Sequence, residues 1–239
     1  MDPILLARCD AGETFGIAPS ALEHAGAPTT VWQAVDGEPR PSLDGVAGVV
    51  LFGSSYNVEH ADEQRFIADA RSLTREAVER GLPYLGICFG AQMLAWSLDA
   101  PVVKAPVREV GYEPIRPNDE AEIDPLLGHY ADGDRVFQWH MDTFGLPEGA
   151  VRLASGDRVE NQAYRVGERA WGVQWHFEID RPELEQWLVS FEGAGGPLDV
   201  SWGKTAEAVR EEADRFQADH EVKGRAVFAR FAALASAAR

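Results

Sequence analysis

The first half of the chain alternates short, continuous apolar runs with segments of helical periodicity. Residues 60–81 are the clearest helix, because their apolar positions from Phe66 to Val78 share one face and Gly81 follows. The other predicted helices are residues 18–26 and 90–98, and the predicted strands are residues 4–8, 29–35, 46–53 and 83–87. Since these strands are apolar throughout, we expect a parallel sheet with helices on both faces.

The second half changes character, because its apolar runs are short and broken by turn residues. The pattern predicts strands within residues 101–105, 108–117, 134–141, 150–156, 161–167 and 170–177, and such strands suit antiparallel additions to the sheet. Helices are predicted over residues 181–191 and from about 206 to 235, with a break at 193–197. The segment after the break is too short for a core of its own. We therefore expect one domain over residues 1–239, with residues 197–239 as a C-terminal helical extension.

The composition narrows the function classes. The 239 residues carry a net charge of −17, which disfavours binding to nucleic acid and to anionic membranes. The N-terminus lacks the pattern of a signal peptide, and no segment has the roughly 18 apolar residues of a membrane span. The two cysteines, Cys9 and Cys88, cannot form a disulfide framework. We expect a cytoplasmic location.

Cys88 lies in an unusual local sequence, Gly86-Ile87-Cys88-Phe89-Gly90, between an apolar strand and a helix. This pattern has the form of a nucleophile elbow, with cysteine in place of serine. A tight strand-to-helix turn requires small residues two positions away on either side. The helix N-terminus favours the thiolate, and the Phe89 N–H can receive an oxyanion. The alternative is a buried structural cysteine. We read Cys9 as an ordinary core or loop thiol.

A cysteine nucleophile needs a base, and two of the six histidines lie in apolar surroundings, His140 and His176. We expect the others to lie in loops or to be solvated. His176 is preferred because it ends an apolar strand, and Glu178 follows two residues later. In an extended chain this spacing places both side chains on one face, where the carboxylate can hold the imidazole. The alternative is a solvated histidine and glutamate. We expect no metal site, because no third ligand stands at a recognised spacing.

Two motifs together resemble those of class I, triad-type glutamine amidotransferases. Residues 86–95, GICFGAQMLA, resemble the family's G-x-C-x-G-x-Q motif, and residues 172–178, GVQWHFE, resemble its G-x-Q-x-H-x-E motif. Residues 108–115, REVGYEPI, resemble a further E-[IV]-G-[WY] stretch of these domains. The similarity is greatest to stand-alone, GMP-synthetase-like members. It implies a flavodoxin-like three-layer sandwich with a central, mostly parallel sheet.

The resemblance also implies roles for individual residues. Cys88 would be the nucleophile that forms a γ-glutamyl thioester, His176 its base, and Glu178 the group that orients His176. Gly53 and Phe89 would donate N–H groups to the oxyanion. Gln92 and the backbone around Trp139 and His140 would bind the substrate. We expect a small-molecule substrate, a separate synthase as ammonia acceptor and no cofactor.

Three positions depart from the family pattern. Phe177 replaces a common proline, Phe52-Gly53-Ser54-Ser55 replaces a Gly-Gly-Pro turn, and Trp139-His140-Met141-Asp142 replaces Ser-His-Gly-Asp. We expect Trp139, Phe177 and Tyr56 to reshape the substrate pocket. The alternative functions are therefore a γ-glutamyl peptidase or hydrolase that transfers no ammonia and, from another class, a non-catalytic binding module.

Overall fold

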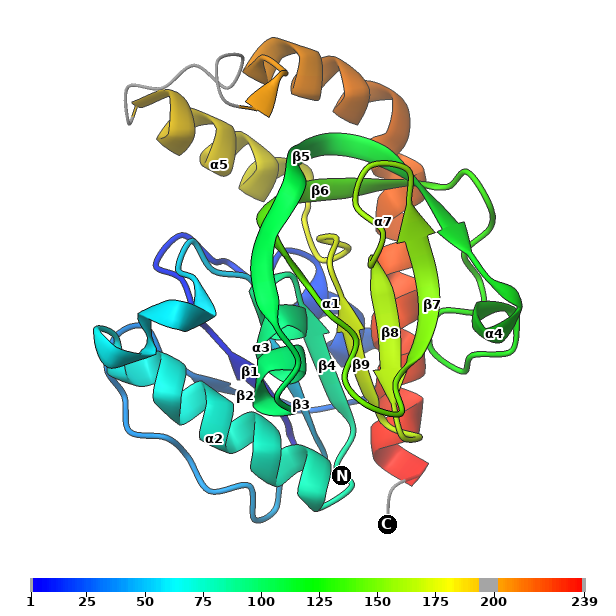
Figure 1. The fold of residues 1–239 in the computed structure, drawn as a ribbon. Coiled ribbons are helices and arrows are strands. Elements are labelled where there is room, and N and C mark those ends of the chain that lie inside the picture. Colours follow the sequence, from blue (N-terminus) through cyan, green and yellow to red (C-terminus); the bar gives the residue numbers. More distant parts are fainter. Residues whose placement is uncertain (1, 194–201, 238–239) are drawn as a thin grey trace.

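A nine-stranded mixed sheet forms the centre of the molecule, which we describe from a computed structural model (Figure 1). The structure describes residues 2–193 and 202–237. The strand order is β2-β1-β3-β4-β9-β8-β7-β5-β6. The strands are β1 (Ile4–Ala7), β2 (Thr29–Trp32), β3 (Gly48–Leu51), β4 (Tyr84–Ile87), β5 (Val102–Pro117), β6 (Arg135–Phe144), β7 (Val151–Gly156), β8 (Ala163–Val166) and β9 (Ala170–Val173).

The parallel half of the sheet has the strand order of flavodoxin-like folds. Strands β2, β1, β3, β4 and β9 pair in parallel with one another. Strands β8, β7, β5 and β6 then extend the sheet in antiparallel pairs. This confirms the expected sandwich, because the order 2-1-3-4-5 is the doubly wound arrangement in which ligands bind at the carboxyl ends of the strands.

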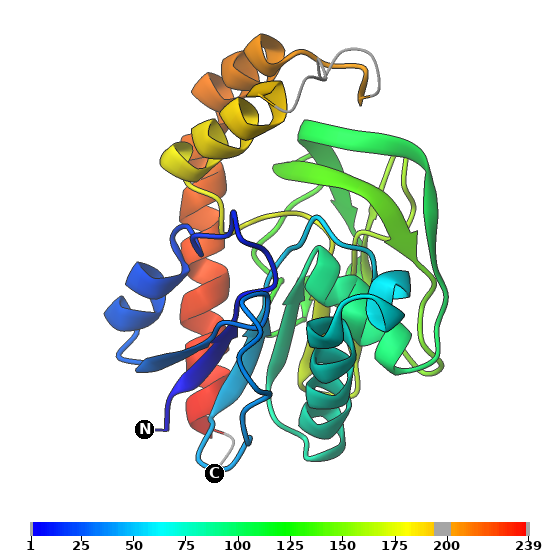
Figure 2. The ribbon, with the colours of Figure 1, turned by 90° about the vertical axis from the view of Figure 1, so that its left-hand side faces the viewer.

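Helices cover the two faces of the parallel half, as its fully apolar strands predicted (Figures 1 and 2). Helices α1 (Ala18–His24) and α7 (Ala206–Ala237) pack on the face that receives Ile4 and Leu6 of β1. Helices α2 (Arg65–Glu79) and α3 (Phe89–Ser97) pack on the opposite face, which receives Leu5 and Ala7. Successive residues of the strand thus enter two separate cores.

Helix α5 (Arg181–Gly193) and the first part of α7 lie beyond the sheet, beside β5 and β6. A third apolar cluster joins these elements through Tyr112, Phe137, Leu184 and Trp202. A short helix, α4 (Asp119–Glu122), follows β5. The cluster fixes α5 and α7 against the antiparallel strands, so both helices contribute residues near the carboxyl edge of the sheet.

Several predicted boundaries were wrong. Residues 101–105 and 108–117 form one long strand, β5, whose pairing with β6 shifts register between Lys104 and Glu109. The helix predicted over 60–81 is a 3₁₀ turn, η1 (Val58–Asp62), followed by α2. The part of the predicted break and of the C-terminal extension over 194–201 lies outside the described residues. The single-domain organisation stays a prediction.

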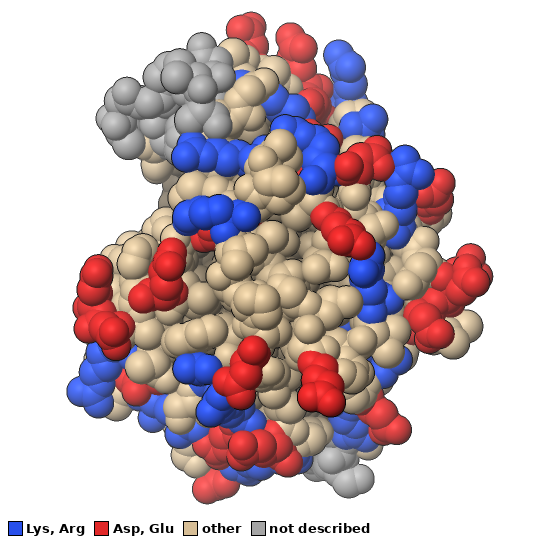
Figure 3. All heavy atoms as spheres, in the orientation of Figure 1, with Lys and Arg blue, Asp and Glu red and all other residues tan. Residues whose placement is uncertain are grey.

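The surface carries charged side chains of both signs. On the face in Figure 3, acidic and basic side chains are interspersed and form no continuous patch of one sign. Of the helices that the structure describes, none combines the length and apolarity that a membrane crossing needs.

Candidate active site

A cavity of about 390 Å³ lies where the carboxyl ends of the parallel strands meet. The segments that follow β1, β3, β4 and β9 contribute Glu13, Gly53, Cys88 and His176 to its lining. Residues of β6 and of α5 complete the walls. The remaining lining residues are Asp10, Gly12, Ser54, Ser55, Tyr56, Asn57, Gln92, Trp139, His140, Met141, Asp142, Gln186, Trp187, Ser190 and Trp202. We call this space the Cys88 cavity.

Cys88 has the strained backbone that the elbow pattern predicted. Its φ of 50° and ψ of −104° are unusual for a residue with a side chain, and its N–H donates to the Val173 carbonyl at 2.8 Å. The two glycines allow this turn. A Cβ at Gly86 would lie 2.2 Å from the Gly90 carbonyl oxygen, and a Cβ at Gly90 would lie 2.0 Å from the Leu51 carbonyl oxygen. The elbow therefore excludes side chains at both positions.

Two backbone N–H groups at this edge of the sheet have no partner among the described residues. Helix α3 begins at Phe89, and the first N–H groups of a helix have no partner within it. Among the described residues, the N–H groups of Gly53 and Phe89 have no hydrogen-bond acceptor. These are the two groups predicted from the sequence for an oxyanion hole, and that role stays a prediction.

His176 and Glu178 form a tight buried pair. The His176 Nδ1 and Glu178 Oε1 atoms are 2.6 Å apart, and both residues are almost completely buried. Burial alone would lower the pKa of His176, but the charges of Glu178 and Cys88, and hydrogen bonds to both, raise it well above its usual value. The His176 ring therefore holds its proton and can donate it to a group in the cavity.

The reason given for this pairing from the sequence was wrong. Strand β9 ends at Val173, three residues before His176, and residues 177–178 lie in a turn. The carboxylate thus reaches the imidazole because the chain turns back, whereas the sequence argument assumed an extended strand.

Two further residues hold His176 in place. The ring packs so closely on Gly53 that a Cβ there would lie 2.7 Å from the His176 Cε1 atom. Behind the site, His220 of α7 lies with its Nε2 atom 2.8 Å from the His176 carbonyl oxygen. Burial lowers the pKa of His220 to about 4, so the neutral ring donates from Nε2 to this carbonyl. The expectation that His220 is solvated was wrong, because α7 packs that face against the sheet.

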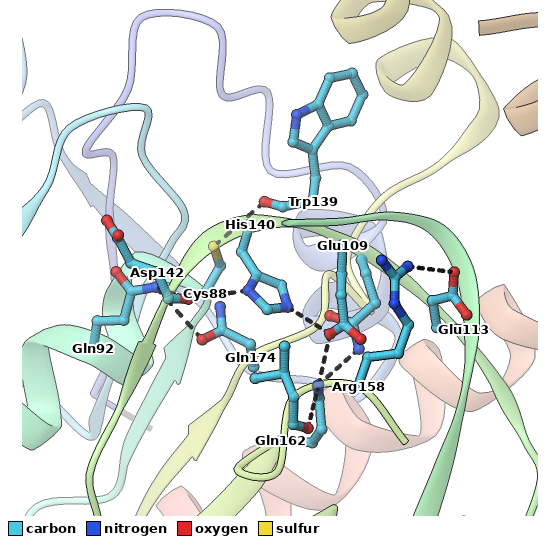
Figure 4. A network of polar contacts seen from close by, with 12 residues as sticks. Cys88, Gln92, Glu109, Glu113, Trp139, His140, Asp142, Arg158, Gln162 and Gln174 are labelled. Carbon is cyan, nitrogen blue, oxygen red and sulfur yellow. Dashed lines mark hydrogen bonds and ion pairs between the residues drawn. The ribbon is translucent and has the colours of Figure 1, made fainter. Parts of the chain in front are cut away.

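Gln92, Trp139 and His140 all lie at the cavity, but they face it differently. The Gln92 side-chain amide is 3.3 Å from the Asp142 carbonyl oxygen, and the Trp139 carbonyl oxygen is 3.9 Å from the Cys88 sulfur (Figure 4). The His140 ring points into the protein. Its Nε2 atom is 3.0 Å from Glu109 Oε2, and its Nδ1 atom is 3.0 Å from the Asp142 carbonyl oxygen. The backbone of residues 139–142 is therefore the part that meets the cavity beside the sulfur.

A buried polar network supports this stretch of β6 (Figure 4). Glu109 of β5 accepts hydrogen bonds from His140 and from the Gln162 side chain, the latter at 2.9 Å. The Gln138 side chain donates to Gln162 at 2.7 Å. Sequence reasoning noted Glu109 only as part of a motif, and assigned it no role. Both ring nitrogens of His140 are paired, while the buried Gln138 Oε1 atom has no hydrogen-bond partner among the described residues. The two contacts of the His140 ring hold residues 139–142 in place.

The departures from the family pattern have different consequences. Trp139 and Tyr56 line the Cys88 cavity, as expected. Phe177 does not, because its ring is fully buried and packs against Phe228 of α7, with ring centroids 5.2 Å apart. Across residues 2–193 and 202–237, no group of three or more His, Cys, Asp or Glu is arranged to hold a metal ion.

The fold and the site define an α/β protein with a cysteine at a strand-to-helix elbow and a histidine–glutamate pair beside it. The sequence profile of the family "glutamine amidotransferase class-I" matches residues 16–190. The chain belongs to this family, whose members are cysteine-dependent amidohydrolases.

Individual relatives agree with this assignment. The chain is 38% identical over 145 residues to a GMP synthase [glutamine-hydrolyzing] of Porphyromonas gingivalis, a match that covers 59% of this chain and 26% of the relative. It is 30% identical over 148 residues to a putative glutamine amidotransferase-like protein of Salmonella typhimurium, covering 61% of this chain and 62% of that protein. The matched part thus spans about a quarter of the length of that GMP synthase.

Solved structures resemble almost the whole chain. A glutamine amidotransferase from Thermotoga maritima superposes with a TM-score of 0.86 at 25% identity, covering 97% of this chain and 99% of that one. A second, from Methylobacillus flagellatus, superposes with a TM-score of 0.85 at 24% identity, covering 97% and 94%. At 24% identity, the resemblance to the Methylobacillus flagellatus structure shows a shared fold and nothing more.

Proposed function

We propose that this protein hydrolyses the side-chain amide of glutamine and passes the ammonia to a separate synthase in the cytoplasm. The observation that carries the proposal is that Cys88, at a strained elbow, and His176, which is paired with the buried Glu178, line one cavity. A nucleophile, a base and a group that orients the base are the three parts that acyl transfer requires.

In the proposed reaction, the Cys88 thiolate attacks the carboxamide carbon of glutamine. The carbonyl oxygen becomes an oxyanion that accepts hydrogen bonds from the N–H groups of Gly53 and Phe89. His176 holds the proton of the thiol and delivers it to the departing ammonia, so that a γ-glutamyl thioester remains on Cys88. His176 then takes a proton from water, which attacks the thioester, and returns it to the sulfur as glutamate leaves. Glu178 keeps the His176 ring in the required orientation throughout.

The substrate would lie against β6. The backbone of Trp139 and His140 would hold the α-amino and α-carboxylate groups, while Gln92 would help to hold the chain of the substrate. The position of the Trp139 carbonyl, 3.9 Å from the sulfur, supports this placement. Matches to proteins named GMP synthase [glutamine-hydrolyzing] support the use of ammonia by a synthase.

A second candidate is hydrolysis of larger γ-glutamyl amides without ammonia transfer. It is favoured by the size of the Cys88 cavity, about 390 Å³. Cavities of about 300–1,000 Å³ are typical of sites for drug-sized ligands, which exceed an amino acid in size. Trp139, Trp187 and Trp202 line the cavity and offer apolar surface to such a leaving group.

The test is a kinetic comparison of glutamine with a panel of γ-glutamyl amides and dipeptides, measured as glutamate release. We expect hydrolysis by the wild type and a loss of more than about a thousandfold for Cys88→Ala, the nucleophile variant. Cys9→Ala is the matched control, because Cys9 is the other buried cysteine and does not line the cavity. Preference for glutamine supports the first candidate, and preference for larger amides supports the second. Unchanged hydrolysis in Cys88→Ala would contradict both.

A further inference from the structure

Two carboxyl side chains that the proposed reaction does not use are buried beside the site. Glu13, in the loop after β1, is 4% exposed, and Glu183, in the first turn of α5, is 1% exposed. In the part of the chain that the structure describes, neither forms an ion pair with a lysine or arginine. Buried carboxylates without a cation are costly, so this arrangement requires another explanation.

Backbone N–H groups of one short loop donate a hydrogen bond to one oxygen of each carboxyl group. Thr14 N–H donates to Glu183 Oε1 at 2.7 Å, and Phe15 N–H donates to Glu13 Oε1 at 2.6 Å. The buried Glu183 Oε2 atom receives no hydrogen bond from any N–H or hydroxyl group of the described residues. The two carboxyl groups interact with each other, so a proton on one of them is the donor that this oxygen lacks.

The electrostatic surroundings favour such a proton. Burial raises the pKa of Glu13 well above its usual value, and the charges of Glu183 and Glu178 raise it further, against the opposing effects of the Phe15 N–H and His176. Burial also raises the pKa of Glu183, and Glu178 adds to this. Two neighbouring carboxylates in a buried site do not both ionise readily, so a proton on one of them is favoured.

The same loop also holds the segment that carries Glu178. Ile17 N–H donates to the Glu178 carbonyl at 2.8 Å. Gly16 has a φ of +46°, and a Cβ there would lie 2.0 Å from the Glu178 carbonyl oxygen and 2.9 Å from Glu183 Oε2. The loop therefore packs closely against the backbone of Glu178 and against the side chain of Glu183.

We propose that Glu13 and Glu183 are positioning residues that share one proton and fasten the β1–α1 loop to α5, so that Glu178 remains directed at His176. This inference rests on the proposed function, because it assigns the pair a role in maintaining the proposed triad.

The proposal has a consequence for pH dependence. Loss of the shared proton, as pH rises through the raised pKa of the pair, leaves two buried negative charges beside Glu178, and their repulsion loosens the loop. The other ionisable groups around the pair are Arg8, Cys9 and Asp10 before the loop, and His176, Glu178 and Asp180 after β9. Only Arg8 carries a permanent positive charge, and its guanidinium contacts the Glu13 backbone carbonyl at 3.0 Å, not the carboxyl group.

The test compares Glu183→Gln and Glu183→Ala with the wild type over a range of pH. Glutamine keeps the shape of Glu183 and donates an N–H to Glu13, so it imitates the pair with one proton at every pH. We expect Glu183→Gln to match the highest kcat/KM of the wild type and to lack the decline of the wild type as pH rises through the raised pKa of the pair. Glu183→Ala removes the contact, and we expect a fall of about tenfold to a hundredfold. The matched control is Glu185→Gln on the same helix, since Glu185 pairs with Arg181 and Arg210 at the surface.

A second readout does not depend on hydrolysis. The rate at which iodoacetamide alkylates Cys88, followed by peptide mass spectrometry, reports the Cys88–His176 pair in every variant. All variants should share the inflection that comes from His176 itself. We expect a second inflection, from the shared proton, in the wild type and not in Glu183→Gln or Glu13→Gln.

These outcomes separate the two proposals. If the wild type hydrolyses no γ-glutamyl amide, the proposed function fails, while the alkylation profiles still decide the role of the pair. Profiles of Glu183→Gln and Glu13→Gln that superpose on the wild type would overturn the proton-sharing role. The proton-sharing role would also be overturned if folded Glu183→Gln lost as much kcat/KM as Glu183→Ala.

Discussion

Gly53→Ala tests whether the position of the His176 ring determines activity. A Cβ at residue 53 would lie 2.7 Å from the His176 Cε1 atom, whereas ordinary contacts begin at 3.4 Å. The ring must therefore move by about 0.7 Å, because Gly53 lies only two residues after the end of the buried strand β3 and its backbone has little freedom to shift. Glu178 opposes this movement through its 2.6 Å contact with Nδ1. A misplacement of about 1 Å in an active site can cost about a hundredfold in rate.

We therefore expect kcat/KM of Gly53→Ala to fall by at least about tenfold, which corresponds to about 1.4 kcal/mol of transition-state stabilisation. The assay is glutamate release from the best substrate of the panel, with the thermal unfolding midpoint measured on the same samples. The substitution changes no backbone N–H group, so the loss would come from the displaced imidazole.

Gly48→Ala is the matched control at the other end of the same strand. A Cβ there would lie 3.2 Å from the Pro83 carbonyl oxygen and 3.3 Å from the Phe231 ring, far from His176. We expect a lower unfolding midpoint and an unchanged kcat/KM for the folded protein. Wild-type kcat/KM in Gly53→Ala would refute the reasoning.

Two other predictions concern residues that support the site. Glu109→Ala removes the partner of His140 Nε2, and an unpaired buried polar group costs about 1–3 kcal/mol. KM should therefore rise by about tenfold. Glu113→Ala on the same strand is the control and should leave KM unchanged. The folded pKa of His220 is about 4, below the unfolded value of 6.5. Unfolding therefore takes up a proton between these values, and the free energy of unfolding should fall by about 3 kcal/mol as pH drops through this window. Urea unfolding should show a smaller fall in His220→Gln, and an equal fall would contradict the assignment.

The elbow and the parallel sheet could be predicted because their requirements are local. The sequence indicated that the chain packs too closely beside Cys88 for side chains two residues away. In the structure, a side chain at Gly86 or Gly90 would clash with the backbone, as expected. Apolar strands alternating with helices are sufficient to indicate a sheet covered on both faces. The His176–Glu178 contact was also found, although a turn and not an extended strand produces it.

The residues that support the site could not be predicted, because their environments arise from distant segments. Glu183 resembles any acidic residue in the first turn of a helix, and only the loop after β1 makes it a buried partner of Glu13. His220 lies in a strongly charged part of α7, where its sequence neighbours indicate solvent exposure. The packing of α7 against the sheet buries it and directs its ring to the His176 carbonyl.

The most direct test of the account is to trap the covalent intermediate. Rapid acid quenching of the protein during turnover of glutamine or the preferred γ-glutamyl amide, followed by intact and peptide mass spectrometry, should show one added γ-glutamyl group on the peptide that contains Cys88. Cys9→Ala should give the same adduct and Cys88→Ala none. Turnover without an adduct on Cys88, or an adduct that persists in Cys88→Ala, would contradict the central claim that this sulfur is the nucleophile.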